Sequence, residues 1–274
     1  MLSASFVALV GLALPLVINP FYILLLNDMV IFGLLAISFN FAFGFANIPS
    51  FGHAAFFGTG AYGIVLLTRN ATELPVVNDG IILPIVLTLL AGIGFALFIG
   101  VFALRGIGIY FALITFGFAE IFHQLILRAE ITNGIDGLIF ITPEIPFEIN
   151  LDLTVMYYIS YIALVATLLV FYWMLRSSFG RAVSAVRANA GRAKYVGYPV
   201  KRIKLTVFTV SATFTTFGGI LFALSNKFVN PGQASAEISI DLIIMTIIGG
   251  ASTLLGPLVG AVIYILIEHL TRDL

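Results

Sequence analysis

The sequence predicts an all-α membrane protein with about eight transmembrane helices, on the evidence of its composition, its long apolar runs and the placement of its charges. Of its 274 residues, 61% are hydrophobic and only 9% are charged, whereas soluble domains carry roughly 25% charged residues. Such a chain cannot cover itself with a surface that water solvates. Its apolar runs are continuous rather than alternating with polar residues, which favours helices over a membrane β-barrel.

A helical span needs about 20 mostly apolar residues. Runs of this kind cover residues 4–18, 29–46, 51–68, 82–104, 107–127, 155–175 and 205–225. The stretch 238–270 is long enough for one broken helix or two shorter ones, because glycines and Pro257 interrupt it. We therefore expect eight spans, with nine as the alternative. Since no Lys or Arg precedes residues 4–18, we expect a first span there rather than a cleaved signal peptide.

Lys and Arg residues predict the orientation of the chain. Eight of the 13 basic residues fall between Arg176 and Lys204, where there is no acid, so this loop should be cytoplasmic. The segment 128–154 holds five acidic residues against Arg128 alone, so it should face outward. Counting spans from these two loops places the N-terminus in the cytoplasm and Arg105 on the same side. We therefore expect a protein that crosses a membrane several times, with its N-terminus in the cytoplasm.

The stretch "FANIPSFGHAAFFGTGAYG" (45–63) puts polar residues and four glycines into an apolar chain. Small residues let neighbouring helix backbones approach closely in lipid, and Pro49 indicates a re-entrant turn or a helix start nearby. Asn47 and His53 either satisfy backbone groups freed by that irregularity or line a solute pathway. A second interrupted stretch, "IIGGASTLLGPLVGA" (247–261), echoes the first, as paired broken segments do in transport proteins.

Two further helices carry polar side chains on one face. Glu120, His123 and Gln124 share a face of the run 107–127, roughly 20 Å from its start. They form either a structural cluster or an outer vestibule that meets the solute. On the run 205–225, four threonines, of which Thr209 and Thr213 are the central pair, fall within one narrow arc. Their hydroxyls either pack and bond to helix backbones or line the pathway.

The loop 176–204, "RSSFGRAVSAVRANAGRAKYVGYPVKRIK", is too long for a tight turn and too basic to be buried. Its alanine-rich centre predicts a short helix ended by Gly197, with Pro199 two residues later. Basic loops stay inside the cell, which explains the charge but not the helix with its own stop signal. An amphipathic helix lying on the membrane is one alternative, and a docking helix for a cytoplasmic partner explains more of the pattern.

Several kinds of chemistry are excluded by the residues themselves. The chain has no cysteine, so it has no disulfide or zinc-thiolate site. It lacks the GxxxxGK[ST] loop that binds ATP. Its three histidines, at 53, 123 and 269, lack the spacing of a metal site. We find no catalytic constellation and a net charge of zero, so we expect neither an enzyme nor a nucleic-acid partner.

Five segments, in order and spacing, resemble the LivM-type inner-membrane permeases of branched-chain amino acid ABC importers, and the resemblance covers residues 29–270. They are "NIPSFGHAAFFGTGAYG", "LRGIGIYFALITFGFAEI", "TNGIDGL", "FGRAVSAVRANAGRAKYVGYPV" and "IIGGASTLLGPLVGA". The resemblance implies a single permease domain (1–274) that contains a cytoplasmic coupling loop (176–204). It implies three kinds of protein partner besides membrane lipid: a LivH-type second permease, two cytoplasmic ATPase subunits that bind ATP and Mg, and an extracytoplasmic solute-binding protein. It also implies a location in a prokaryotic inner or plasma membrane.

The resemblance also implies roles for individual residues. Residues 187–199 match the segment that couples such permeases to their ATPases, so we expect coupling roles for Arg187, Ala193, Lys194, Gly197 and Tyr198. Acidic residues common in that segment are absent here, which alters the polarity of the ATPase contact. Asp136, in "TNGIDGL", falls where the solute-binding protein docks.

Leucine, isoleucine or valine is the expected solute, with urea, short amides or other small solutes as alternatives within the same family. A stand-alone ion-coupled carrier is the alternative from another class. Such a carrier would need an intramembrane ion site made of carboxylates and unwound backbone. Glu120 and Asp241 are the candidates for that site.

Overall fold

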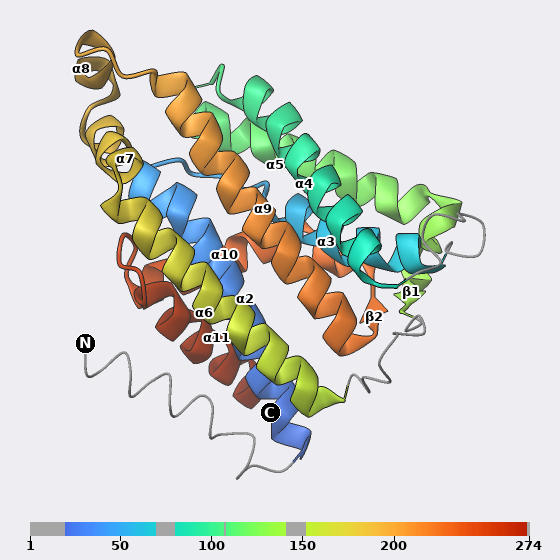
Figure 1. Cartoon of the computed structure of the whole chain (residues 1–274). Coiled ribbons are helices and arrows are strands. Elements are labelled where there is room, and N and C mark those ends of the chain that lie inside the picture. Colours follow the sequence, from blue (N-terminus) through green and yellow to red (C-terminus); the bar gives the residue numbers. More distant parts are fainter. Residues whose placement is uncertain (1–19, 70–79, 107, 141–151, 273–274) are drawn as a thin grey trace.

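The chain is a bundle of long helices. The computed structural model describes residues 20–69, 80–106, 108–140 and 152–272 (Figure 1). The helices are α2 (Pro20–Ala46), α3 (His53–Arg69), α4 (Ile82–Ala103), α5 (Ile109–Arg128), α6 (Leu153–Arg176), α7 (Ser178–Ala188), α8 (Ala190–Tyr195), α9 (Val200–Asn226), α10 (Ala236–Gly249) and α11 (Gly256–Arg272). Short 3₁₀ turns lie at Glu130–Thr132, Gly134–Asp136 and Pro231–Ala234. Two short strands, β1 (Leu138–Ile139) and β2 (Phe228–Val229), pair in antiparallel fashion.

Five described helices are long and apolar enough to cross a membrane, namely α2 from Tyr22 onward, α4, α5, α6 and α9. They coincide with five of the predicted runs, which confirms an all-α protein that crosses the membrane several times. The run 51–68 forms α3, which has 17 residues. The run 4–18 lies outside the described residues. The total of eight spans therefore stays a prediction.

Helices α2 and α9 form the centre of the bundle, and both are largely enclosed by their neighbours. Helix α2 begins nine residues before the predicted start at 29, because Asn27 and Asp28 continue the helix instead of ending it. The Asn27 side-chain amide donates a hydrogen bond to the hydroxyl of Ser225 on α9, and both side chains are buried. Asn226 donates to the Asp28 carboxylate at 3.3 Å. Pairing across two helices lets these polar groups lie inside the bundle.

Glycines bring α3 against α9. A Cβ atom placed on Gly60 would lie 2.0 Å from the carbonyl oxygen of Thr216, and one on Gly219 would lie 2.2 Å from the carbonyl oxygen of Phe57. Both obstacles are backbone atoms, so no side-chain rotation could make room. The prediction that small residues in the stretch 45–63 allow close helix packing is therefore confirmed.

The connection between α2 and α3 is irregular and mostly buried, so its backbone groups need partners inside the protein. The amide of Phe51 donates to the Thr115 hydroxyl of α5 at 3.2 Å. The amide of Ala54 donates to the Ser239 hydroxyl of α10 at 2.9 Å. Pro49 lies within this connection, and α3 begins four residues after it, at His53. The turn near Pro49 thus brings α5 and α10 to the start of α3.

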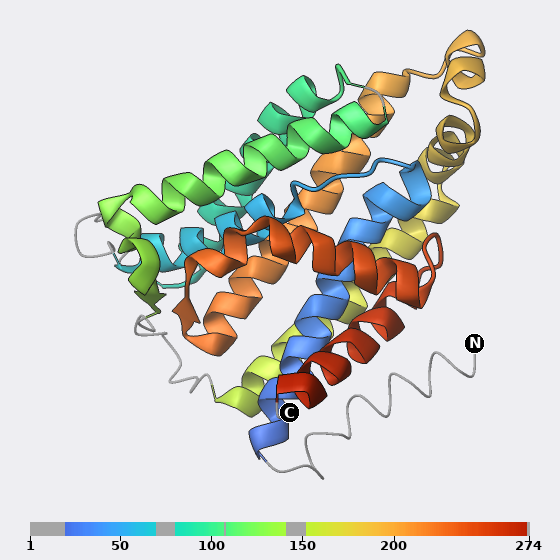
Figure 2. The ribbon, with the colours of Figure 1, turned by 180° about the vertical axis from the view of Figure 1, so that it is seen from behind.

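The stretch 238–270 forms two helices, α10 and α11, which resolves the choice left open by the sequence. They pack tightly, since a Cβ atom on Gly260 would lie 1.8 Å from the Met245 carbonyl oxygen. Figure 2 shows α11 running beside α2 while α10 crosses it, in agreement with the contacts between these helices. In both interrupted stretches, therefore, some glycines allow close backbone contact, as Gly60 and Gly260 show.

The basic loop contains two helices, α7 and α8, where the sequence predicted one. The break falls at Asn189, whose backbone is extended (φ −162°, ψ 102°). Its side-chain oxygen accepts a hydrogen bond from the amide of Arg192 at 2.9 Å and so caps α8. A strong N-cap residue in the middle of an alanine-rich segment starts a new helix, which is why the single predicted helix was wrong.

Candidate functional site

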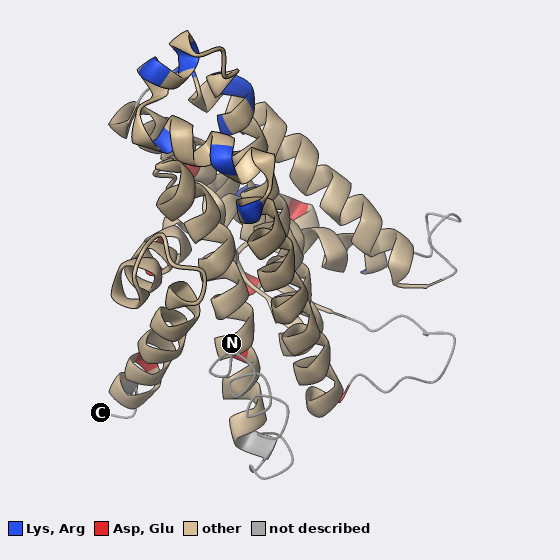
Figure 3. Cartoon of the chain, turned by 60° about the vertical axis from the view of Figure 1, so that its left-hand side comes forward, with Lys and Arg blue, Asp and Glu red and all other residues tan. Residues whose placement is uncertain are grey.

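Most Lys and Arg residues gather at one end of the molecule, which we call the basic end, as Figure 3 shows. There the connection after α2, the turn between α4 and α5, and the segment from α8 into α9 surround a cavity of about 710 Å³. Asn47 lies on its rim, is exposed, and has a left-handed backbone (φ 53°). The cavity wall also holds five basic side chains: Arg105, Lys194, Lys201, Arg202 and Lys204.

Helix α8 ends as the sequence predicted, at Gly197. This glycine has φ +95°, its amide donates to the Lys194 carbonyl at 3.1 Å, and the Tyr198 amide donates to the Ala193 carbonyl at 3.0 Å. These two bonds are the Schellman pattern, which needs a left-handed residue that glycine supplies without strain. The chain thus turns sharply between α8 and α9, and α8 projects from the bundle.

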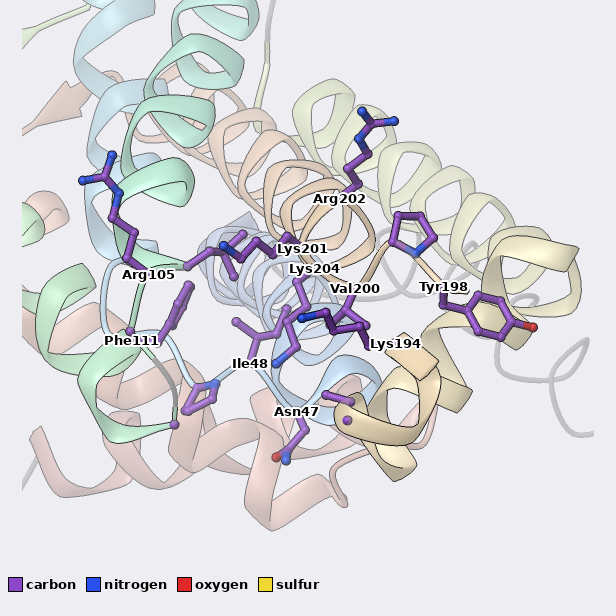
Figure 4. A pocket seen from close by; sticks show the side chains of 17 residues that line it. Asn47, Ile48, Arg105, Phe111, Lys194, Tyr198, Val200, Lys201, Arg202 and Lys204 are labelled. Atoms are coloured by element: carbon purple, nitrogen blue, oxygen red, sulfur yellow. The ribbon is translucent and has the colours of Figure 1, made fainter. Parts of the chain in front are cut away.

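The residues of α8 and its C-cap residue Val196 form an anchored side and an exposed tip. Ala193 is buried at 5% exposure, whereas Tyr195 and Val196 are 93% and 78% exposed. Figure 4 shows Lys194 pointing into the cavity and Tyr198 pointing away from it. Tyr195 and Val196 were not among the residues predicted from the sequence, because nothing in the pattern distinguishes them from neighbouring exposed positions.

Arg187, at the end of α7, is tied to the α10–α11 connection. Its guanidinium donates to the Ser252 hydroxyl at 2.7 Å, and that hydroxyl donates to the Gly44 carbonyl of α2 at 2.9 Å. Asn40 of α2 holds the same connection, since its side chain accepts from the Ser252 amide at 3.0 Å and donates to the Thr253 carbonyl at 2.8 Å. The basic loop is therefore hydrogen-bonded to the second interrupted stretch and, through it, to the central helix.

His53, the first residue of α3, is fully buried at the crossing of α2, α3 and α9. Its Nε2 lies 2.8 Å from the Ser211 hydroxyl, which donates its only hydrogen to the Ser38 carbonyl at 2.5 Å. Nε2 must then carry the proton, which leaves Nδ1 as an acceptor. Nδ1 has no hydrogen-bond partner in the described part of the chain. The rings of Phe39, Phe56 and Phe208 meet the imidazole edge-to-face.

The threonines of α9 bond mainly to their own helix. Thr213 donates to the Thr209 carbonyl at 2.8 Å, and Thr216 donates to the Ala212 carbonyl at 3.0 Å. Thr209 and Thr213 are half-buried. The hydroxyl of Thr209 is enclosed and has no hydrogen-bond partner among the described residues.

Glu120, His123 and Gln124 lie on a weakly covered part of α5. Gln124 donates to the Glu120 carboxylate at 2.9 Å, and His123 Nδ1 is 4.0 Å from the other carboxylate oxygen. The Glu120 side chain is 42% exposed. It lines an open groove of about 480 Å³ with its helix neighbours Phe116, Gln124 and Arg128. An exposed carboxylate within a spanning helix is costly in hydrocarbon, so this face is suited to water or a partner protein rather than lipid.

Asp136 lies beyond the end of α5, in an exposed turn. The turn leads through Gly137 (φ 71°) into β1, which pairs with β2 after α9. Loops that follow α5 and α9 are therefore joined, away from the basic end. The predicted functional residues fall into separate places: the basic end, the buried crossing at His53, the exposed face of α5, and the turn at Asp136.

Metal binding finds no support in the part of the chain that the structure describes. There, no three His, Cys, Asp or Glu residues come close enough together to hold an ion.

Asp241 is half-buried and accepts a hydrogen bond from the Tyr264 hydroxyl at 2.5 Å, which ties α10 to α11.

Over most of its length, the chain is similar in sequence to permease proteins of one kind. The high-affinity branched-chain amino acid transport system permease protein LivM of Escherichia coli is 28% identical over 268 residues, 89% of this chain and 62% of that protein. LivM of Salmonella typhimurium is 27% identical over 96% of this chain and 67% of its own length. The L-arabinose ABC transporter permease protein AraH of Azospirillum brasilense is 36% identical over 34% of this chain. No solved structure matches the chain.

The chain thus spans a little under two thirds of the length of its Escherichia coli relative. The family described as the permease component of branched-chain amino acid transport systems matches residues 21–274, which include α2 to α11 and the whole basic end. This chain therefore belongs to the family of permease components of branched-chain amino acid transport systems.

Proposed function

We propose that this chain is the transmembrane permease subunit of an ATP-driven importer of branched-chain amino acids. The observation that carries the proposal is the similarity to two LivM permeases over 89% and 96% of the chain. The chain lacks a nucleotide-binding loop of its own. ATP and Mg would therefore be bound by two cytoplasmic ATPase subunits. A LivH-type second permease and an extracytoplasmic solute-binding protein would complete the importer.

The basic end would face the cytoplasm, with the N-terminus on the same side and eight spans in all. The positions of Arg105 and the loop 176–204 support this orientation, because span counting puts both on one side and the cavity brings both to one end. Asp136 would then face outward, where the solute-binding protein docks.

The coupling role of α7 and α8 rests on their exposure and on their bond to the bundle. The tip at Tyr195 and Val196 offers an apolar surface to an ATPase subunit. Arg187 connects the same segment to Ser252 and thereby to α2. Movement of α8 on ATP binding would thus be transmitted to the connection between α10 and α11. Gly197 would set the angle at which α8 is held, and Lys194 and Tyr198 flank that turn.

The face of α5 around Glu120 would lie against the second permease and line a wet part of the solute pathway. The partial exposure of Glu120 and the groove beside it support this position. His53, Asn47, Thr209 and Thr213 remain candidates for other parts of the pathway. Among the described residues, the Nδ1 of His53 and the hydroxyl of Thr209 have no hydrogen-bond partner, so either could accept a hydrogen bond from a passing solute.

We expect Glu120→Gln to raise the solute concentration needed for half-maximal uptake by about tenfold, because a neutral amide loses a charge-assisted hydrogen bond to the ammonium group of an amino acid. Uptake into vesicles containing the whole complex measures this. Glu130→Gln, an exposed acid beyond the same helix, is the matched control. If Glu120→Gln leaves both affinity and rate unchanged, the cluster is structural.

The substrate is tested by giving such vesicles labelled leucine, isoleucine, valine, urea and L-arabinose. We expect ATP-dependent uptake of the three branched-chain amino acids and little uptake of urea or arabinose. Arabinose belongs in the panel because AraH matches a third of the chain. Uptake of urea or arabinose in preference to the amino acids would contradict the substrate assignment while leaving the permease assignment intact.

A further inference from the structure

The cavity at the basic end has a chemistry that the coupling role does not use. Among the described residues of its wall there are five cations, which are the basic side chains named above, and no Asp or Glu. None of the five forms an ion pair with any residue in the described part of the chain. Positive charges gathered around one cavity repel one another unless an anion joins them. The cavity is therefore suited to a negatively charged ligand.

Two helix ends add to this electrostatic preference. Helices α5 and α9 both begin at the cavity, where Gly108 and Pro199 occupy their N-cap positions. Within the described residues, neither end is capped by a side-chain hydrogen bond. Free backbone amides at a helix N-terminus attract anions, and phosphate groups are frequent ligands there.

The side chains divide into those that enter the cavity and those that do not. Figure 4 shows Lys194, Lys201 and Lys204 extending into it from α8 and α9, whereas Arg202 points away. Ile48 and Phe111, at 2% and 3% exposure, form an apolar part of the wall. The cavity thus combines three ammonium groups with an apolar surface.

We propose that this cavity binds the phosphate-bearing headgroup of an anionic phospholipid. The residues that directly follow α4 and the first residues of α5 and α9 surround the cavity, so it lies where spanning helices end. Basic pockets between helices at this level bind anionic headgroups. Lys and Arg side chains there bury their stems in apolar surroundings and direct their charges to the interface.

An apolar surface next to the cavity favours a lipid over an acidic protein segment. Val101 and Phe102, in the last turn of α4, are 50% and 40% exposed. The Arg105 guanidinium lies over the Phe102 ring, 5.2 Å from its centre, and Arg105 also lines the cavity. A lipid whose phosphate occupies the cavity could lay its acyl chains along this side of α4. An acidic peptide would leave that surface unused.

The test uses the purified full-length chain in nanodiscs that contain phosphatidylglycerol and phosphatidylcholine with the same acyl chains. Native mass spectrometry of the released protein counts the lipids that stay bound. We expect the unmodified chain to retain phosphatidylglycerol preferentially. The K201Q/K204Q variant should lower that retention by roughly tenfold or more, since each cation near anionic lipid contributes substantially to binding.

Two variants serve as controls. R176Q/R181Q removes two positive charges from the same end but from positions outside the cavity wall, and it should change retention less than twofold. K201R/K204R keeps both charges and should retain the lipid. Size-exclusion chromatography of each variant establishes that loss of lipid is not loss of fold.

Three results would overturn the proposal. The first is equal retention of phosphatidylglycerol and phosphatidylcholine by the unmodified chain, or an equal loss of phosphatidylglycerol retention in K201Q/K204Q and in R176Q/R181Q. The second is displacement of the lipid by excess inorganic phosphate that then occupies the cavity, which would make it a site for a free anion. The third is normal lipid retention by K201Q/K204Q together with lost binding to the ATPase subunits, which would assign the cavity to an acidic protein segment. The experiment measures no uptake, so its failure is distinguishable from failure of the transport proposal.

Discussion

Replacing Gly60 with valine is expected to prevent the protein from reaching its native packing. The Cβ of any larger residue would lie 2.0 Å from the Thr216 carbonyl oxygen and close to Gly219. Because these neighbours belong to the backbone of α9, relief requires α3 and α9 to move apart. Overpacking a core against side chains typically costs about 1–3 kcal/mol, so we expect a loss of about 3 kcal/mol or more here. The yield of monodisperse protein and its thermal unfolding midpoint in detergent measure the effect.

Gly94→Ala is the matched control for that substitution. Gly94 is also a helical glycine, on α4, but a Cβ atom there meets no atom of the described residues within 4 Å. Alanine favours helix over glycine by about 1 kcal/mol, so Gly94→Ala should leave stability unchanged or slightly raised. If Gly60→Val were as stable as Gly94→Ala, the close contact between α3 and α9 would be wrong.

Reversing the charge of Arg187 is expected to separate ATP hydrolysis from transport. Arg187→Glu removes the hydrogen bond from α7 to Ser252 and places a carboxylate beside a hydroxyl that already donates to Gly44. The fold should survive, because Arg187 is at the exposed end of a short helix. We expect uptake by the complete complex to fall more than tenfold while ATP hydrolysis continues. Parallel measurements of uptake and phosphate release in the same vesicles test this.

Arg181→Glu is the control for Arg187→Glu, since Arg181 is an exposed arginine of the same helix. It should change uptake little. Ser252→Ala removes the same hydrogen bond from its other partner and should weaken uptake in the same direction as Arg187→Glu. Normal import by both Arg187→Glu and Ser252→Ala would exclude this contact from coupling.

The sequence predicted the spanning helices well because apolar runs of sufficient length have few alternatives in a membrane. It placed the start of α2 too late, since Asn27 and Asp28 look like a helix end until their partners Ser225 and Asn226 are known. Those partners lie 198 residues away. Such long-range pairs cannot be read from local pattern.

In the candidate site too, features set by neighbouring residues were predictable from the sequence, whereas contacts between distant segments were not. The sharp end of α8 was predictable, because Gly197 followed by Pro199 is a local signal. The bond from Arg187 to Ser252 and the cavity between α4, α5, α8 and α9 were not predictable, because they join segments far apart in the chain. Asn40 carried a usable signal, since an amide in the middle of an apolar run usually has a specific partner.

The most direct test measures uptake of labelled leucine by vesicles that contain this chain and its second permease. The solute-binding protein and internal ATP are present throughout. Uptake is compared between vesicles with the ATPase subunits and vesicles without them. We expect uptake against a gradient when the ATPase subunits are present and none when they are left out. Uphill uptake without them, driven by an ion gradient, would show that the chain belongs to a carrier that needs no coupling segment.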